Sequence, residues 1–281
     1  MSDFCTLQEF TAAPRAANTL RLLSFNIQVG IQAAAYHHYL LRSWQHILPA
    51  RGRDLALQRI AGLVQHFDLV ALQEADAGSW RSRQQNQVSR LAEEAGFPHW
   101  YQQVNRNLGQ FAQHSNGVLA RLPAVQVEQF QLPGLLPGRG LMLLTFGEGN
   151  DALTVAITHL ALGKRTQFGQ LEFLCEKVQH AKHLVIMGDL NQEAEILLRH
   201  SPLQHLNLHP LMARATYPSW RPQRGLDHIL LSDSIALQRI AVIDHPLSDH
   251  LPVAAEIILP GQSGCFHQRQ HRLYYTHIFM A

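Results

Sequence analysis

The chain has 281 residues, of which 46% are hydrophobic and 16% are charged, so it can bury a large core and is not a disordered protein. One large α/β domain fits this length. The formal net charge of +2 is too mild to indicate a nucleic-acid partner, and it decides nothing about the substrate. The three cysteines are far apart without C-x-x-C spacing, which indicates neither a thiolate zinc site nor a disulfide framework.

The N-terminal residues "MSDFCTLQEFTAAPRAANTL" contain no basic stretch followed by an apolar run. No segment of the chain reaches the roughly 18 uninterrupted apolar residues of a membrane span. We therefore expect a cytoplasmic protein without a transmembrane segment, and the sequence leaves its oligomeric state open.

Apolar runs of strand length alternate with helical patterns along the chain. Residues 20–27 predict a buried strand, and residues 53–67 predict a helix before the apolar run "DLVALQE", which together form a β-α-β unit. In that helix one apolar face is predicted to hold Leu55, Ile60, Leu63, Val64 and Phe67. Further strands are predicted at 99–104, 115–121, 124–132, 140–146, 151–158, 182–188, 226–231, 235–243 and 252–258, with helices near 84–95, 166–180 and 193–199. Pro and Gly turns join successive strands in the middle of the chain, which favours antiparallel pairing over a doubly wound parallel sheet.

We expect an N-terminal extension over residues 1–19, one domain over 20–259 and a C-terminal tail over 260–281. Within the domain, residues 30–52 form a long connection that is rich in His and aromatic residues. A long connection in a compact domain is often functional. The alternative is a surface helix that packs its apolar residues onto the core, and these are Tyr36, Leu40, Trp44 and Ile47.

Several of the predicted strands end in carboxylate, amide or imidazole side chains. These residues are Asn26, Glu74, Asn116, His159, Asp189, Asn191, Asp227, Asp249 and His250. Each of these residues alone is more often a helix cap, a solvated strand end or a structural residue than a functional one. Together they are the residue types that bind a hard cation or a phosphate group, and a buried unpaired carboxylate costs several kcal/mol. Their co-occurrence indicates an enzyme that uses a metal ion on a phosphate ester.

The motifs that carry these residues are, in chain order, "SFNIQ", "ALQEAD", "SNGVLAR", "THLALG", "GDLNQE", "GLDHILLS" and "SDHLPV". Over roughly residues 20 to 258 they resemble the endonuclease/exonuclease/phosphatase superfamily of deoxyribonuclease I-like phosphoesterases. The resemblance implies a four-layer α/β sandwich of two mostly antiparallel mixed sheets flanked by helices. It also implies a site at the edge where the sheets meet and a divalent cation, usually Mg²⁺, with Mn²⁺ as an alternative.

By this resemblance Asn26, Glu74 and Asp249 would be the metal ligands, since Mg²⁺ prefers hard oxygen donors. His250 would be the general base that takes a proton from the attacking water. Asp227 would hold the other ring nitrogen of His250 and raise its basicity.

The remaining site residues would act on the water and on the phosphate group. Asp189 would orient the water, and Asn191 would donate to a non-bridging phosphoryl oxygen. His159 and Asn116 would also contact phosphoryl oxygens, where negative charge develops in the transition state. The expected reaction is hydrolysis of a phosphodiester or phosphomonoester by in-line attack of water.

The substrate stays open between several classes. A nuclease would use scattered arginines to line a groove for backbone phosphates, namely Arg42, Arg51, Arg53, Arg81, Arg83, Arg106 and Arg165. A phosphodiesterase of lipid headgroups, similar to a sphingomyelinase, or an enzyme of small phosphate esters would use residues 30–52 as a wall or membrane-facing lip. The loop with Trp220, Arg221 and Arg224 either brackets a phosphate or is a surface loop. An inactive binding scaffold is the least favoured alternative.

Overall fold

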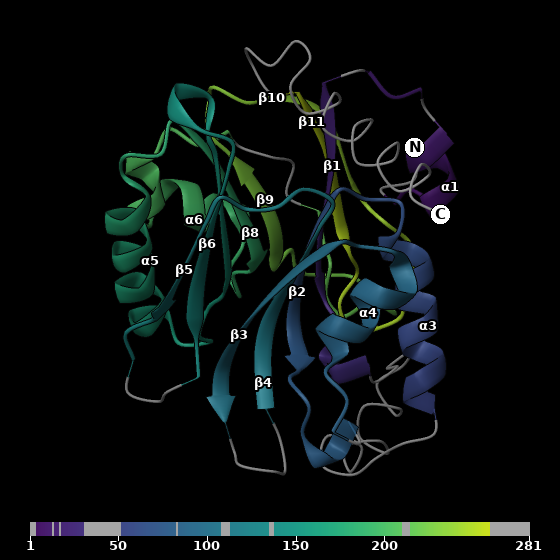
Figure 1. The fold of residues 1–281 in the computed structure, drawn as a ribbon. Helices are drawn as coiled ribbons and strands as arrows, with labels where there is room; N and C mark the ends of the chain where they lie inside the picture. Colours follow the sequence, from purple (N-terminus) through teal and green to yellow (C-terminus); the bar gives the residue numbers. More distant parts are fainter. Residues whose placement is uncertain are drawn as a thin grey trace.

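The computed structural model describes residues 4–12, 14–16, 18–30, 52–82, 84–107, 113–134, 138–209 and 214–258 (Figure 1). The predicted connection 30–52 lies outside the described residues except at its two ends, and so does the predicted tail 260–281. The site predicted from the strand ends lies wholly within the described part.

The described residues form the strands and helices of a mixed α/β protein. The strands are β1 (Thr19–Asn26), β2 (Leu69–Asp76), β3 (His99–Asn107), β4 (Gln113–Ala120), β5 (Gln126–Gln131), β6 (Gly140–Phe146), β7 (Leu153–His159), β8 (His183–Asp189), β9 (Asp227–Leu231), β10 (Ala236–Val242) and β11 (Val253–Ile258). The helices are α1 (Leu7–Ala12), α3 (Gly52–Val64), α4 (Gln87–Ala95), α5 (Lys164–Val178) and α6 (Ala194–Arg199), with short 3-10 turns at Gln28–Gly30, Trp80–Ser82, Gly149–Asp151 and Pro202–His205.

The strands form two mixed sheets. The six-stranded sheet has the order β10-β11-β1-β2-β4-β3, and the five-stranded sheet has the order β5-β6-β7-β8-β9. Pairing is antiparallel except between β1 and β2 and between β7 and β8, where a helix connects parallel neighbours. The antiparallel pairing of the middle strands and the β-α-β unit predicted from the sequence are therefore confirmed.

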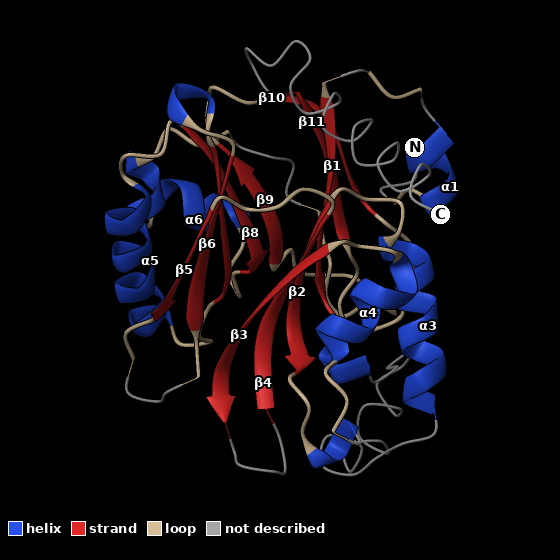
Figure 2. Cartoon of the chain, viewed as in Figure 1, coloured by secondary structure: helices blue, strands red, loops and turns tan. Residues whose placement is uncertain are grey.

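The two sheets pack face to face, and helices cover their outer faces (Figure 2). One apolar cluster lies between α3, α4 and the six-stranded sheet, a second fills the space between the sheets, and a third lies under α5 and α6. Each fully buried aliphatic or aromatic side chain in these layers contributes about 1.5–3 kcal/mol. The arrangement is the predicted four-layer α/β sandwich.

Two local features differ from the sequence prediction. Leu55 was placed on the buried face of α3, but its side chain is 51% exposed, whereas Leu57 is buried. At 100° per residue Leu55 points about 140° away from Ile60, so the predicted face was too wide. The segment predicted as an extension contains α1, which was not predicted, and its Phe10 is fully buried against Phe67.

Candidate active site

Three of the predicted residues are brought together by the register of the five-stranded sheet. His159 ends β7 beside Asp189 at the end of β8, and Asp189 stands opposite Asp227 at the start of β9. All three side chains are buried. Nε2 of His159 lies 3.4 Å from Oδ2 of Asp189. Adjacent strands thus carry one imidazole and two carboxylates at the same level of the sheet.

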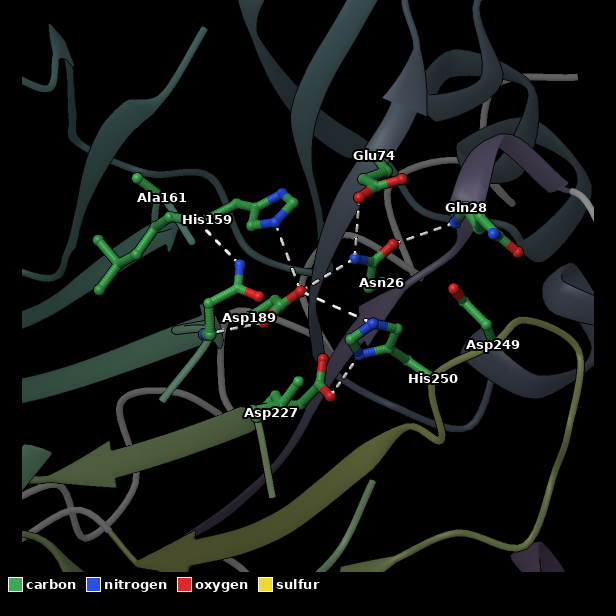
Figure 3. Close-up of polar contacts among 12 residues, drawn as sticks. Asn26, Gln28, Glu74, His159, Ala161, Asp189, Asp227, Asp249 and His250 are labelled. Carbon is green, nitrogen blue, oxygen red and sulfur yellow. Dashed lines mark hydrogen bonds and ion pairs between the residues drawn. The ribbon is translucent and has the colours of Figure 1, made fainter. Parts of the chain in front are cut away.

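Two more residues come from the facing edge of the six-stranded sheet. Asn26 ends β1, and its Nδ2 donates to Oε1 of Glu74 at 3.3 Å and to Oδ2 of Asp189 at 3.1 Å (Figure 3). Glu74 has a φ of 56°, at a register shift between Leu72 and Ala75 in the pairing of β2 with β4. Such a bulge re-aims a side chain. Here it places Glu74 beside Asn26, and Asn26 joins the two sheets.

The backbone around Asp189 accounts for the "GDLN" motif. Gly188 has a φ of 149°, and a Cβ at this position would lie 1.8 Å from the carbonyl oxygen of Thr158. Only glycine therefore fits at this close approach of β8 to β7. Asn191 has a φ of 52°, and its N–H donates to Oδ1 of Asp189 at 3.0 Å. Gly188 on one side and the N–H of Asn191 on the other therefore fix the position of Asp189.

His250 and Asp227 form a hydrogen-bonded pair. Nδ1 of His250 lies 2.7 Å from Oδ2 of Asp227, and the hydroxyl of Thr216 donates to the same oxygen at 2.6 Å. The ring of Tyr217 packs against the imidazole, with 4.8 Å between the ring centroids. The other imidazole nitrogen, Nε2, lies 3.8 Å from Oδ2 of Asp189. Asp227 thus holds the ring of His250 so that Nε2 faces Asp189.

Asp249, Asn191 and Asn116 complete the predicted set. Asp249 lies on the loop before β11, and Figure 3 shows its carboxylate on the side of Asn26 and Glu74. Its Oδ1 accepts from the Ser248 hydroxyl at 3.1 Å. Nδ2 of Asn191 donates to the Leu160 carbonyl at 2.9 Å. Nδ2 of Asn116, on β4, donates to the Gly140 carbonyl at 3.5 Å.

Burial and mutual charge shift the titration of these groups. Burial is the main reason that the pKa of Asp189 is raised to about 7 and the pKa of Asp249 to about 6. Burial also lowers the pKa of His159 well below its usual value, and the nearby Arg139 acts in the same direction. Burial alone would lower the pKa of His250, but the charges of Asp227 and Asp189 raise it well above the usual value.

Two groups of side chains have donor sets suited to a divalent cation. Asp189, Asp227 and His250 present ligand atoms that all lie within 4.8 Å of one another. The predicted ligands Asn26, Glu74 and Asp249 form the second group. In the first group, Oδ2 of Asp227 already accepts from Thr216 and pairs with His250. The second group offers only oxygen donors, and burial disfavours the charged forms of both Asp249 and Asp189, so a divalent cation would stabilise either group.

Sequence reasoning missed several residues around the site. Thr216 and Tyr217 lie in a hairpin that pairs Tyr217 with Arg224, and no local pattern shows that this hairpin returns to Asp227. Ser248 was visible in "SDH" but was assigned no role. Arg139 directly precedes β6, and the charges of Glu74 and Asp189 act on it. The sequence "LPGRG" predicts only a turn and gives no sign of this contact.

The fold and the site together define a class, an α/β sandwich with a buried acidic and imidazole cluster at the edge where two sheets meet. A family model described as "Endonuclease/Exonuclease/phosphatase family" matches residues 23–250. The chain belongs to this family, which confirms the resemblance found in the sequence. No curated protein matches the chain.

Solved structures with the same fold include an endonuclease/exonuclease/phosphatase from Beutenbergia cavernae DSM 12333, which is 22% identical with a TM-score of 0.66, over 87% of this chain and 72% of that one. A mannosyl-6-phosphatase from Bacteroides thetaiotaomicron VPI-5482 is 17% identical with a TM-score of 0.60, over 85% of this chain and 100% of that one. The human Nocturnin catalytic domain with a bound sulfate anion is 17% identical with a TM-score of 0.60, over 86% of this chain and 95% of that one. At these identities the likeness shows the fold.

Within the described part of the chain, no helix is both long and apolar enough to cross a membrane.

Proposed function

We propose that this chain is a hydrolase that cleaves a phosphodiester or phosphomonoester by in-line attack of water and depends on a divalent cation, Mg²⁺ or alternatively Mn²⁺. The observation that carries the proposal is the series Thr216, Asp227 and His250, which are joined by hydrogen bonds and end opposite Asp189. Asn26 connects this series to Glu74 on the facing sheet. A base, a water-orienting carboxylate and a set of oxygen donors therefore share one site.

We assign the cation to Asn26, Glu74 and Asp249. The side-chain oxygen of Asn26 accepts from the N–H of Gln28 at 3.1 Å, and its nitrogen faces Glu74 and Asp189. A carbonyl oxygen has two lone pairs, so this hydrogen bond leaves one lone pair for a cation. When bound, the cation would supply positive charge to the phosphoryl oxygens and to the leaving oxygen.

We assign His250 as the general base. Asp227 binds Nδ1, so Nε2 is the nitrogen that can accept a proton from water. The 3.8 Å between Nε2 and Oδ2 of Asp189 is too long for a direct hydrogen bond, and both atoms can bind the same water. The carboxylates of Asp227 and Asp189 favour the protonated ring, so His250 acts as a base only once it has lost its proton, and the two carboxylates then stabilise the imidazolium that forms when water gives up its proton.

We assign His159, Asn191 and Asn116 to the phosphoryl oxygens. His159 is neutral near pH 7, because burial lowers its pKa, so it contributes a hydrogen bond and not a full charge. Each amide has two N–H donors, and one donor of Asn191 is bound to the Leu160 carbonyl. The second donor is available for a phosphoryl oxygen, where it would act on charge that develops during the reaction.

The experiment that tests this function is a substrate panel with purified protein. Plasmid DNA, RNA, sphingomyelin vesicles, sugar phosphates and a p-nitrophenyl phosphodiester are incubated with EDTA, Mg²⁺ or Mn²⁺. We expect hydrolysis of at least one class with a cation and none with EDTA. Cleavage of nucleic acid that falls steeply with added salt would indicate a nuclease, and turnover on vesicles a lipid phosphodiesterase. The absence of cation-dependent hydrolysis across the whole panel would instead support a binding scaffold.

A further inference from the structure

A cavity of about 590 Å³ opens beside the candidate active site. Its wall nearest the site is formed by Glu74, Asn116 and His159. From there it extends away from His250 toward the start of α5, which contributes Gly163 and Thr166. Small-molecule sites commonly have volumes of about 300–1,000 Å³. The cavity is therefore large enough to hold the part of a substrate that does not react.

One wall of this cavity is cationic. It contains Arg106, at the end of β3, and Arg139, just before β6, together with His114 on β4. The aliphatic stem of Arg106 packs on Gly138, where an added Cβ would lie 3.2 Å from both Cβ and Cδ of Arg106. Because Gly138 precedes Arg139, this contact places the two arginines side by side.

In the described part of the chain, neither guanidinium group is paired directly with a carboxylate, although the charges of Glu74 and Asp189 act on Arg139. Among the residues that the structure describes, neither Arg106 nor Arg139 forms an ion pair, and Glu74 is the only carboxylate that lines the cavity. Arg139 is half-buried, and burial lowers its pKa; the charges of Glu74 and Asp189 oppose this shift, and the charge of Arg106 adds to it. Two adjacent cations without a carboxylate between them are an arrangement that an anion stabilises.

The start of α5 adds backbone donors to the same wall. The helix is 15 residues long and begins after Gly163, which has no side chain to cap the first N–H groups. Free N–H groups and the positive end of the helix dipole favour an anion at this position. The helix start and the arginines belong to different parts of the fold, yet both line this one cavity.

We propose that this cavity binds a second phosphate group of the substrate, so that the preferred substrate carries one phosphate at the His250 end and another beside Arg106 and Arg139. This inference rests on the proposed function, because the first phosphate is the one that is hydrolysed. The second phosphate could belong to a small bisphosphorylated molecule or be a neighbouring phosphate of a nucleic-acid strand. Both present the same chemistry to the cavity.

The test uses pairs of substrates that differ only in the second phosphate. One pair is fructose 6-phosphate and fructose 1,6-bisphosphate, and the other is a thymidine dinucleotide with and without a terminal phosphate. The quantity compared is the ratio of kcat/KM within each pair, measured with Mg²⁺. We expect the wild-type protein to favour the member with two phosphates about 10- to 100-fold in at least one pair, as a charged hydrogen bond would give.

Arg139→Gln and Arg106→Gln should each reduce that ratio about tenfold or more. Arg106 is exposed, so its replacement does not endanger folding if Arg139→Gln unfolds the chain. Arg199→Gln is the matched control, because Arg199 is an exposed arginine on α6 that pairs with Glu195. It should leave the ratio unchanged. Thermal unfolding of every variant checks that the fold is retained.

The outcomes separate the two claims. A preference in the sugar pair identifies a small bisphosphate, and a preference in the dinucleotide pair identifies a strand phosphate; either supports the inference. Equal kcat/KM within both pairs, or a ratio that the Arg106 and Arg139 variants leave unchanged, overturns the second-phosphate site while the proposed hydrolase remains. No cation-dependent hydrolysis of either pair overturns the second-phosphate site, and none across the whole substrate panel overturns the proposed hydrolase as well.

Discussion

Two buried ionic clusters lie at opposite ends of β1, and they differ in how their charges are balanced. At the start of the strand, fully buried Glu256 accepts from Nε of Arg21 at 3.0 Å and from a guanidinium nitrogen of Arg239 at 3.0 Å. Asp68 accepts from the backbone N–H of Arg21 at 2.7 Å and pairs with Arg15. Every carboxylate of this cluster faces at least one arginine.

The cluster at the other end of β1 has an excess of negative charge. Four carboxylates lie there around the imidazole of His250, and the three aspartates among them raise its pKa; the four belong to Glu74, Asp189, Asp227 and Asp249. Two carboxylates about 4 Å apart repel by roughly 4 kcal/mol at an effective dielectric constant of 20. In the first cluster arginines balance the carboxylates, whereas the second has a negative charge that a cation would balance. This difference separates a structural cluster from a functional one.

The largest expected effect tests the functional cluster through activity. Replacing the proposed base, His250→Ala, or the water-orienting carboxylate, Asp189→Asn, should lower kcat by roughly 10²–10⁴-fold, the usual contribution of general base catalysis. Steady-state kinetics on the best substrate of the panel measure this. Thermal unfolding should stay cooperative in both variants. If kcat is unchanged in a folded variant, the assignment of that residue is wrong.

The structural cluster should show the opposite pattern. Glu256→Ala leaves the buried Arg21 and the half-buried Arg239 without their carboxylate, so we expect a loss of roughly 3–5 kcal/mol in the free energy of unfolding. The kcat of the folded fraction should not change. Urea denaturation measures the stability, and Glu195→Ala is the control, since its exposed ion pair with Arg199 contributes little. A loss comparable to that of Glu195→Ala would show that the buried cluster is not structural.

The strands and the polar residues at their ends are the parts of the molecule that the sequence predicts well. Strand-length apolar runs predicted the sheets, because burial on both faces leaves few polar residues, as in β8. The residues at the strand ends could be named because each follows such a run directly. That they would meet followed only from the family resemblance, since sequence order does not reveal that β1 faces β8.

Residues that act through loops or through local distortion were beyond the sequence patterns. Thr216 reaches Asp227 by way of a hairpin, and Arg139 reaches the site from just before β6. The bulge at Glu74 is invisible in "LVALQEAD", which opens with a continuous apolar run like other strands that are buried on both faces. The exposed position of Leu55 depends on which face of α3 packs against the sheet. Each of these depends on contacts between distant segments, which a local window does not contain.

The pH dependence of the free energy of unfolding shows whether the excess negative charge destabilises the fold when no cation is bound. Burial raises the pKa of Asp249 from 3.8 to about 6. A raised folded-state pKa contributes stability that is fully present below pH 3.8 and is lost as the pH rises through about 6. With EDTA at about pH 8, Asp249→Asn should therefore be more stable than the wild type by up to about 3 kcal/mol.

The same variant should lose its response to the cation. Near pH 4 the advantage of Asp249→Asn should vanish, because the wild-type carboxyl group is then largely protonated. Added Mg²⁺ should raise the melting temperature of the wild type and change that of Asp249→Asn much less, since binding to the folded state stabilises it. Calorimetry at both pH values measures this. If Mg²⁺ raises the melting temperature of both proteins equally, the cation does not bind at Asp249, and the group of Asp189, Asp227 and His250 becomes the better assignment.

The smallest effect concerns Thr216, which the functional cluster contains but the sequence did not reveal. Thr216→Val removes the hydroxyl that donates to Asp227 at 2.6 Å, so Asp227 holds His250 less firmly. We expect kcat to fall about tenfold with little change in KM, and stability to fall by about 1.5 kcal/mol. Thr216→Ser retains the hydroxyl and should restore kcat. Because both substitutions remove or alter the same small side chain, recovery only in the serine variant would assign the effect to the hydrogen bond and not to packing.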